Sequence, residues 1–255
     1  MGASPLTATL IGFALVVART AALVLAAPVL GQGTGFAGHR LGLIVFVAFL
    51  LYWVVGGPVT EAEPVALCAM ALREVLIGIF LGFLLQLVLM AVRVSGELVG
   101  QEMGFLVARQ VDPTSGVSSS LVTNLYENVF LLVMLALNGH HWLLRSLERS
   151  FELAPIGRLT LSARLAPTAQ AMFGEMFRAG IVFAAPVLVF LMIVSVLIGL
   201  LARAVPALNV LEIGFTLRVL VALGALFLFA PLMEPALRGL HQEFLRWLER
   251  GLAAL

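Results

Sequence analysis

The sequence predicts an all-α, polytopic membrane protein with about six apolar helices. Of its 255 residues, 62% are hydrophobic and 11% are charged, whereas soluble domains carry about 25% charged residues. The mean hydropathy is +1.10. The apolar residues also form uninterrupted runs close to the length of about 20 residues that a helix needs to cross a bilayer. They do not alternate with polar residues, as they would in membrane strands.

The apolar runs place the predicted helices. The fourth run contains Glu127 and the sixth contains Arg218, and such residues are costly in lipid and are expected to face protein or water. The net charge of +1 gives no excess of basic residues that would suggest a nucleic acid partner. The single cysteine, Cys68, excludes an intramolecular disulfide, and its side chain is expected to be buried. The runs are Leu6–Leu30, Leu41–Val59, Val75–Val92, Leu121–Leu137, Ala179–Ala202 and Ile213–Met233.

The segment REVLIGIFLGFLLQLVLMAVRVSGELVGQEMG, from Arg73 to Gly104, carries a stripe of small residues. Its five glycines fall within one quadrant of a continuous helix. Small residues every fourth position let another backbone approach closely in lipid. Arg93 and Glu97, four residues apart, can form an ion pair. Such a helix would be about 48 Å long against about 30 Å of hydrocarbon. Packing alone accounts for the stripe, and a subunit packed against others around a pore is the more specific alternative.

The next segment, GFLVARQVDPTSGVSSS, interrupts the helical pattern. Asp112-Pro113 forms turns, and Pro113 biases Asp112 away from helical angles. Irregular backbone at membrane depth is tolerated only when it is buried in protein or lines water. The segment is therefore either an exposed outer loop or a loop inserted into a cavity. The apolar Phe105, Leu106 and Val107 favour the inserted loop.

Other features of the sequence suggest no catalytic, cofactor or metal site. His140 and His141 project about 100° apart on a helix and cannot both bind one metal from one face. Asn138-Gly139 is interpreted as a helix-ending turn. Two alternatives stay open: a stand-alone secondary transporter with a midplane site at Arg93, Glu97 and Glu127, and an intramembrane enzyme that uses His140 or His141.

The tail, residues 236–255, is amphipathic. Leu237, Leu240, Phe244 and Leu248 form one apolar stripe opposite the charged residues. The tail is expected either to cap the helical bundle or lie on the membrane face, or to dock a cytosolic partner.

Several motifs together resemble one family. They are REVLIGIFLGF, the run R-x-x-G-E-L-V-G-x-x-M-G-F, V-D-P, N-G-H-x-W-L and L-A-P-I-G, and their order and spacing resemble the FliR family of flagellar type III export-gate membrane proteins. That family is related to the T subunit of virulence type III secretion systems. The resemblance covers nearly the whole chain and is most specific from Arg73 to Gly157.

The resemblance implies a non-enzymatic subunit, without cofactors, of a protein export gate in the bacterial inner membrane, at the flagellar basal body or injectisome base. Residues 1–152 would correspond to a FliP-like part, residues 153–235 to a FliQ-like helical hairpin and residues 236–255 to the tail. FliP-like and FliQ-like subunits would complete a channel for unfolded flagellar or effector proteins. Much of that assembly would lie above the bilayer plane, with an FlhB-like protein at its cytoplasmic mouth.

The resemblance also implies roles for residues. The loop 104–120 would plug the closed channel, although Arg109 stands where more apolar side chains are expected. The residues assigned to this plug are Met103, Gly104, Phe105, Leu106, Val107, Arg109, Asp112, Pro113 and Gly116. The helical spacing described above, and not the resemblance, gives the residues assigned to helix packing and assembly: Gly78, Gly82, Arg93, Gly96, Glu97 and Gly100.

Overall fold

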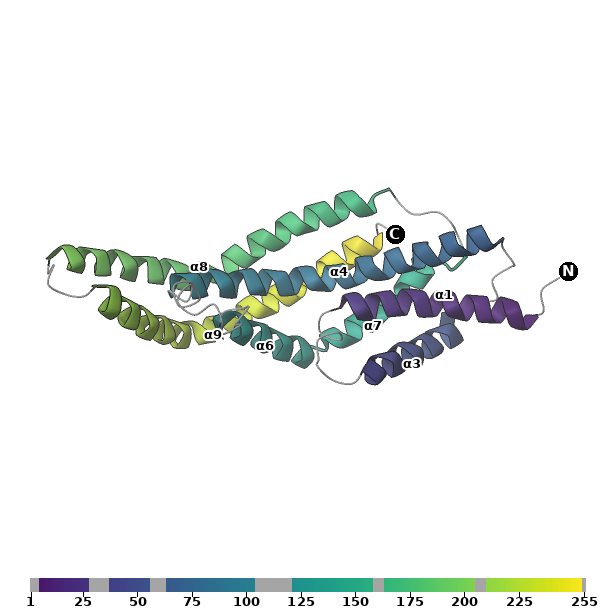
Figure 1. Ribbon diagram of the computed structural model, residues 1–255, viewed down its shortest axis with the longest axis horizontal. Helices are drawn as coiled ribbons and strands as arrows, with labels where there is room; N and C mark the ends of the chain where they lie inside the picture. The colour runs from purple at the N-terminus through teal and green to yellow at the C-terminus, as the bar shows by residue number, and fades with distance from the viewer. Residues whose placement is uncertain are drawn as a thin grey trace. The chain divides into compact units, whose positions relative to one another are not determined.

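The computed structural model describes residues 5–27, 37–55, 63–103, 121–157, 163–204 and 210–253. Within these ranges every regular element is a helix, which confirms the predicted all-α class. Figure 1 shows the helices in chain order: α1 (Pro5–Ala26), α3 (Ala37–Val55), α4 (Pro64–Glu102), α6 (Leu121–Ala136), α7 (Gly139–Leu153), α8 (Leu165–Ala204) and α9 (Val210–Ala253).

Over its described residues each of the predicted apolar runs coincides with a helix, but three helices are longer than their runs. Helix α4 begins at Pro64, a residue that fits the first helical position because its missing N–H has no acceptor there. Helix α8 begins at Leu165, and α9 continues through the tail to Ala253. The added parts contain the charged residues Arg73 and Glu74 in α4, Glu175 and Arg178 in α8, and those of the tail in α9, which interrupt the apolar runs without interrupting the helix.

By length and composition, three described helices can each cross a membrane: Leu6–Ala26, Pro64–Glu102 and Leu165–Ala204. The number rises to five if each of two bent helix pairs, Leu121–Ala136 with Gly139–Leu153 and Thr216–Phe229 with Glu234–Ala253, counts as one span. The apolar part of α3, Arg40–Val55, is shorter. These spans are those of a polytopic helical membrane protein.

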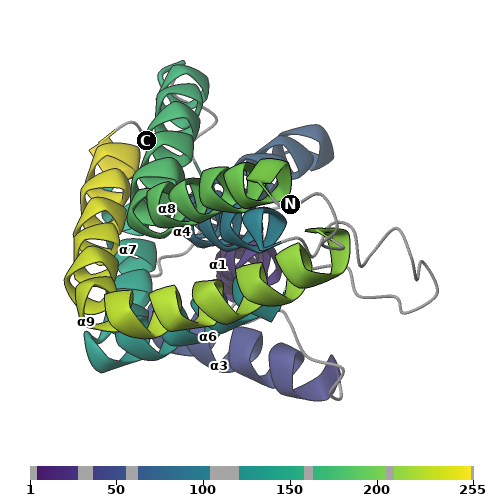
Figure 2. The same ribbon diagram turned by 90° about the vertical axis from the view of Figure 1, so that its left-hand side faces the viewer.

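The chain divides into two compact units. The first comprises Met1–Leu87, Asn138–Phe173 and Gln242–Leu255, and the second comprises Val88–Leu137 and Gly174–His241. In the first unit α1 packs against α3 and lies beside the first part of α4 (Figure 1 and Figure 2). Leu15 of α1 and Met70 of α4 are buried together there, with Ile156 against them. These contacts bring α1, α4 and the end of α7 together around a set of buried polar residues.

The tail is part of the helical bundle. All four residues of its predicted apolar stripe are at most 5% exposed. Inside the first unit Gly251 lies so close to α4 that an added Cβ would be 2.5 Å from Cδ1 of Leu84 and 3.2 Å from Cε1 of Phe80. Of the two alternatives for the tail, the structure supports the capping of the bundle.

Two local predictions have opposite outcomes. Asn138 adopts the left-handed conformation, with φ of 57°, between α6 and α7, so the predicted helix-ending turn is confirmed. Asparagine tolerates this conformation better than most residues.

The expectation of a buried Cys68 is wrong, because this thiol is exposed. It lies in the first turns of α4, before the first buried residue of that helix, Met70.

Candidate functional site

The predicted plug lies outside the described residues, apart from Met103. This methionine follows the last turn of α4, and its N–H donates to the carbonyl oxygen of Val99 at 3.0 Å. Its side chain is 1% exposed. Gly104, Phe105, Leu106, Val107, Arg109, Asp112, Pro113 and Gly116 all belong to the segment 104–120, of which the structure describes nothing.

The glycine stripe of α4 packs against helices of its own chain. In the first unit Gly78 faces α1, and an added Cβ would lie 2.3 Å from the carbonyl oxygen of Arg19. A Cβ on Gly82 would lie 2.5 Å from the Cβ of Ala26. Both distances are shorter than any real Cβ contact, so only glycine allows α1 and α4 to approach this closely.

The stripe continues into the second unit with a different partner helix. There Gly96 faces α6, and an added Cβ would lie 2.5 Å from the Cα of Thr123. Gly100 is also buried. Three of the four glycines assigned to helix packing are therefore close to α1 or α6, and they serve packing within the chain.

The polar residues predicted on the same stripe lie together in the second unit. Arg93 forms an ion pair with Glu127 of α6. The sequence had suggested Glu97 as its partner, but Glu97 instead accepts a hydrogen bond from Oγ1 of Thr123 at 3.3 Å. The close approach at Gly96 explains the difference, because it brings the carboxylate of Glu127 within reach of α4. The three residues of the transporter alternative are thus brought together between α4 and α6.

A serine joins α4 to α8 in the same unit. Oγ of Ser95 donates its hydrogen to the carbonyl oxygens of Gly180, at 2.7 Å, and Ala91, at 2.8 Å. The approach is close because Gly180 has no side chain, and an added Cβ would lie 2.8 Å from the oxygen of Ala91. Tyr126 of α6 meets Phe183 of α8 edge to face, with ring centroids 5.4 Å apart. Helices α4, α6 and α8 therefore form the packed part of the second unit.

We expect the replacement Ser95→Ala to lower the free energy of unfolding by about 1 kcal/mol, because one buried interhelical hydrogen bond is lost. Thermal unfolding of the purified protein in detergent measures the effect. Ser195→Ala on α8 is the matched control, since Oγ of Ser195 has no hydrogen-bond partner in the described part of the chain. Equal losses in the two variants would contradict the assigned hydrogen bond.

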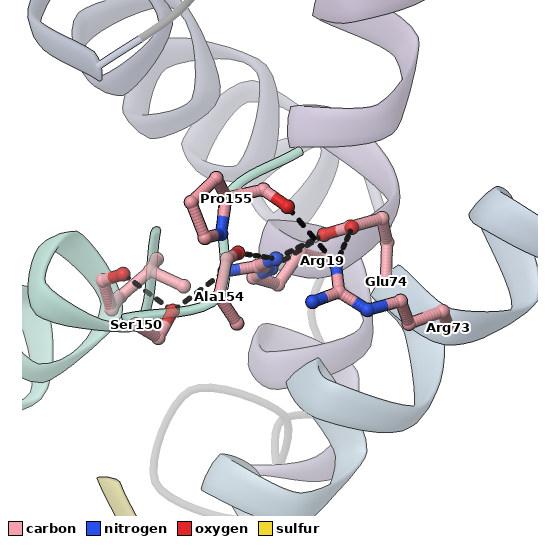
Figure 3. A network of polar contacts seen from close by, with 7 residues as sticks. Arg19, Arg73, Glu74, Ser150, Ala154 and Pro155 are labelled. Atoms are coloured by element: carbon pink, nitrogen blue, oxygen red, sulfur yellow. Dashed lines mark hydrogen bonds and ion pairs between the residues drawn. The ribbon is translucent and has the colours of Figure 1, made fainter. Parts of the chain in front are cut away.

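A second polar cluster, which the sequence analysis did not find, lies in the first unit, and we call it the buried arginine cluster (Figure 3). At its centre Arg19 of α1 donates from Nε to Oε2 of Glu74 on α4, at 2.6 Å. Both side chains are fully buried. Arg73, the residue before Glu74, donates to its other oxygen, Oε1, at 2.9 Å. The cluster comprises Arg19, Arg73, Glu74, Ser150 and the carbonyl groups of Ala154 and Pro155.

The end of α7 supplies the remaining acceptors. Nη1 of Arg19 donates to Oγ of Ser150 at 3.1 Å, and Nη2 donates to the carbonyl oxygen of Ala154 at 2.8 Å. Arg73 donates to the carbonyl oxygen of Pro155 at 3.1 Å. The guanidinium carbon of Arg19 also lies 4.0 Å from the centre of the Phe151 ring. The L-A-P-I-G motif therefore binds both arginines through its backbone.

The charges of the buried arginine cluster do not balance by side chains alone. Arg19 and Arg73 contribute two positive charges and Glu74 one negative charge, which leaves one positive charge. The carbonyl groups at the carboxyl end of α7 carry the negative end of the helix dipole and offset part of it. Since every nitrogen of the Arg19 guanidinium donates to a group of the cluster, the cluster holds α1, α4 and α7 together rather than forming a reaction site.

A signal for this cluster is present in the sequence. Arg19 interrupts the apolar run Leu6–Leu30, and an ionisable residue in such a run usually pairs inside the protein. Arg73-Glu74 stands at the edge of the third run and offers a carboxylate there. The pairing itself required the fold, because 55 residues separate Arg19 from Glu74 and 131 separate it from Ser150.

The histidines of α7 gain no partners for metal binding in the described part of the chain. His140 and His141 are both exposed. Their ring centroids are 4.2 Å apart, closer than the predicted 100° divergence suggests. No group of three or more His, Cys, Asp or Glu residues that could hold a metal occurs among the described residues.

Comparison with known proteins finds one family along most of the chain. The model of the family described as bacterial export proteins, family 1, matches residues 10–244. The flagellar biosynthetic protein FliR of Escherichia coli K12 is 30% identical over 230 residues, which cover 88% of this chain and 86% of the relative. FliR of Bacillus subtilis 168 is 30% identical over 213 residues, with 82% of each protein covered. FliR of Caulobacter vibrioides is 28% identical over 218 residues, with coverage of 84% and 86%.

Proposed function

This chain belongs to family 1 of the bacterial export proteins, the family of the flagellar biosynthetic protein FliR, and on that premise we propose that it is a non-enzymatic subunit of the type III export gate. Membership makes it a membrane component of a bacterial export apparatus. In the proposal it joins FliP-like and FliQ-like subunits to form a passive, gated channel. Unfolded flagellar or effector proteins cross the inner membrane through it at the basal body or injectisome base, and energy comes from elsewhere.

The family match along residues 10–244 carries this proposal. Residues 1–152 correspond in it to the FliP-like part, residues 153–235 to the FliQ-like hairpin and residues 236–255 to the tail. An FlhB-like protein is a further proposed neighbour at the cytoplasmic mouth.

The exposure of α8 supports a role among other helices. Only 22% of its most apolar 18-residue window is buried within the chain, compared with 67% for α4. Val189, Val196 and Leu200 are each more than half exposed. An apolar surface of this extent is normally covered by lipid or by another protein. A subunit of a membrane assembly has such a surface.

The position of Met103 supports the proposed plug. This side chain, the last described one before the segment 104–120, is 1% exposed. In the proposal Phe105, Leu106 and Val107 block the lumen, and Met103 fills space beside them. Gly100, Gly104 and Gly116 act as hinges. Opening displaces the loop, with plugged and open channels as the two states.

Deleting residues 105–119 is expected to leave the assembly intact and to make it leak ions, because the apolar obstruction is removed. Co-purification of FliP-like and FliQ-like subunits with the tagged chain measures assembly, and conductance in planar bilayers measures the leak. The double variant Ser118→Ala and Ser119→Ala is the control, since it changes the same segment but keeps its apolar residues. A deletion complex that assembles and remains impermeable would contradict the plug.

A second candidate, the stand-alone secondary transporter, draws on the grouping of Arg93, Glu97 and Glu127 between α4 and α6. It requires substrate transport by the single purified chain in liposomes. The gate requires the other subunits, so activity of the single chain decides between the two.

A further inference from the structure

The second unit contains an arginine in the apolar helical hairpin of α8 and α9. Along the first part of α9 the buried residues recur every three or four positions: Ala222 is fully buried, and Ala225 and Leu226 are at most 9% exposed. Arg218 precedes Ala222 by four residues and therefore lies on the same inward face. Between them Leu220 is 64% exposed, which marks the outward face.

The facing side of α8 has the same pattern. Leu191 is fully buried and Ile198 is 9% exposed, and Ser195 lies between them on the inward face. Phe190 of α8 meets Phe229 of α9 with ring centroids 6.1 Å apart. The adjacent parts of the two helices can be followed in Figure 1. Arg218 and Ser195 thus lie on inward faces between that aromatic contact and the ends of the two helices.

Two polar atoms on these faces are buried without a hydrogen-bond partner in the described part of the chain: Nε of Arg218 and Oγ of Ser195. Two arginines on α1 and α4 contrast with this. Arg19 binds Glu74, and Arg93 binds Glu127. An arginine in an apolar helix normally pairs with a carboxylate or faces water. The hairpin therefore presents a positive charge that the described residues of this chain leave uncompensated.

We propose that Arg218 is a docking residue for a carboxylate, Asp or Glu, on an apolar helix of another gate subunit. This inference rests on the proposed function. Other faces of the same part of α9 are apolar and exposed at Leu217, Leu220 and Leu223, so the helix that carries the carboxylate is expected to be apolar as well. The partner is thus identified by its chemistry: one acidic side chain within an otherwise apolar helix.

Depth along the hairpin favours a protein carboxylate over a lipid phosphate. Arg218 is eight residues after Val210, the first residue of α9, which corresponds to about 12 Å along the helix axis. Arg203, in the last turn of α8 and exposed, is the residue of this hairpin that is positioned for a headgroup. A phospholipid at Arg218 remains a distinct outcome of the test.

The test compares Arg218→Leu with the control Arg203→Leu, each in a tagged full chain co-expressed with its FliP-like and FliQ-like subunits. We expect Arg218→Leu to lower the recovery of those subunits by about ten-fold or more, because their carboxylate is left buried and unpaired. Arg203→Leu is expected to keep wild-type recovery. The thermal midpoint of the isolated Arg218→Leu chain is expected to stay at or above that of the wild type, since the removed charge is uncompensated there.

A charge exchange identifies the partner residue. Arg218→Glu is combined in turn with replacement by arginine of each acidic residue in the apolar helices of the other subunits, and one combination is expected to restore recovery. The inference would be overturned if Arg218→Leu recovered the FliP-like and FliQ-like subunits as well as the wild type does. A lower thermal midpoint of the isolated Arg218→Leu chain would also overturn it. So would a loss of bound phospholipid from the variant without any loss of subunits. No recovery of subunits by the wild-type chain would overturn the proposed function, and this inference with it.

Discussion

Replacement of Glu74 by alanine is expected to destabilise the protein by about 3–5 kcal/mol. Glu74 is fully buried and accepts from Arg19 and from Arg73 through different oxygens. Without it both guanidinium groups remain buried and lose the carboxylate of the buried arginine cluster, while carbonyl and hydroxyl groups at the end of α7 still accept from them. The loss comes mainly from these uncompensated charges and not from the missing contact.

Thermal unfolding of the purified variant in detergent, followed by circular dichroism, measures this loss. Glu234→Ala is the matched control, because Glu234 pairs with Arg238 four residues along α9 and both side chains are more than half exposed. Exposed pairs contribute about 0–1 kcal/mol. The control should unfold close to the wild type. A Glu74→Ala protein as stable as this control would show that the buried arginine cluster does not stabilise the contact between α1, α4 and α7.

Replacement of Gly78 by alanine is expected to cost about 1–3 kcal/mol, although alanine is the better helix former. The added Cβ would lie 2.3 Å from the carbonyl oxygen of Arg19 and 2.7 Å from the Cβ of Ala22. Backbone atoms cannot turn away as a flexible side chain can, so α1 must move from α4. That movement also disturbs the hydrogen bonds of Arg19 at the same level of α1.

The thermal midpoint of unfolding measures this second effect, and Gly42→Ala provides its control. Gly42 lies in α3 of the same unit, and no atom is within 4 Å of a Cβ added there. The control is expected to gain up to about 1 kcal/mol from helix propensity alone. A Gly78→Ala variant that also gains stability would mean that α1 does not pack at this distance.

The effects of Glu74→Ala and Gly78→Ala concern the same contact between α1 and α4. Gly78 permits α1 to approach α4, and the approach brings Arg19 to Glu74. The same arginine then binds the end of α7. Gly78 and Arg19 therefore act together in holding α1, α4 and α7 in contact.

Much of the fold could be predicted from the sequence. Each apolar run predicted a helix, and the amphipathic stripe of the tail predicted a buried face at Phe244 and Leu248. These predictions depend on the local periodicity of apolar residues and on the absence of water in lipid. Both act on each residue of a run without any knowledge of which other helix lies beside it. The Asn138-Gly139 turn was predicted for a similar reason, since it depends on local backbone preference.

The candidate sites were predicted less completely. The glycine stripe was recognised, but its partners α1 and α6 were not. Glu97 was chosen for Arg93 because it is four residues away on the same helix, whereas the structure pairs Arg93 with Glu127 on α6. Arg19 was not recognised as a site residue at all. In each case the missing information was which helix lies beside which.

The amino-acid sequence by itself determined the class of the protein, the helical runs, the special positions of glycine and proline and, through its motifs, the family resemblance. Tertiary structure alone decided where each buried charge finds its counterpart. Hydrophobic periodicity specifies that a face is buried but not what covers it, because apolar contacts are not directional. Hydrogen bonds and ion pairs are directional, so the partner of Arg19 could be named only when α1, α4 and α7 had been brought together.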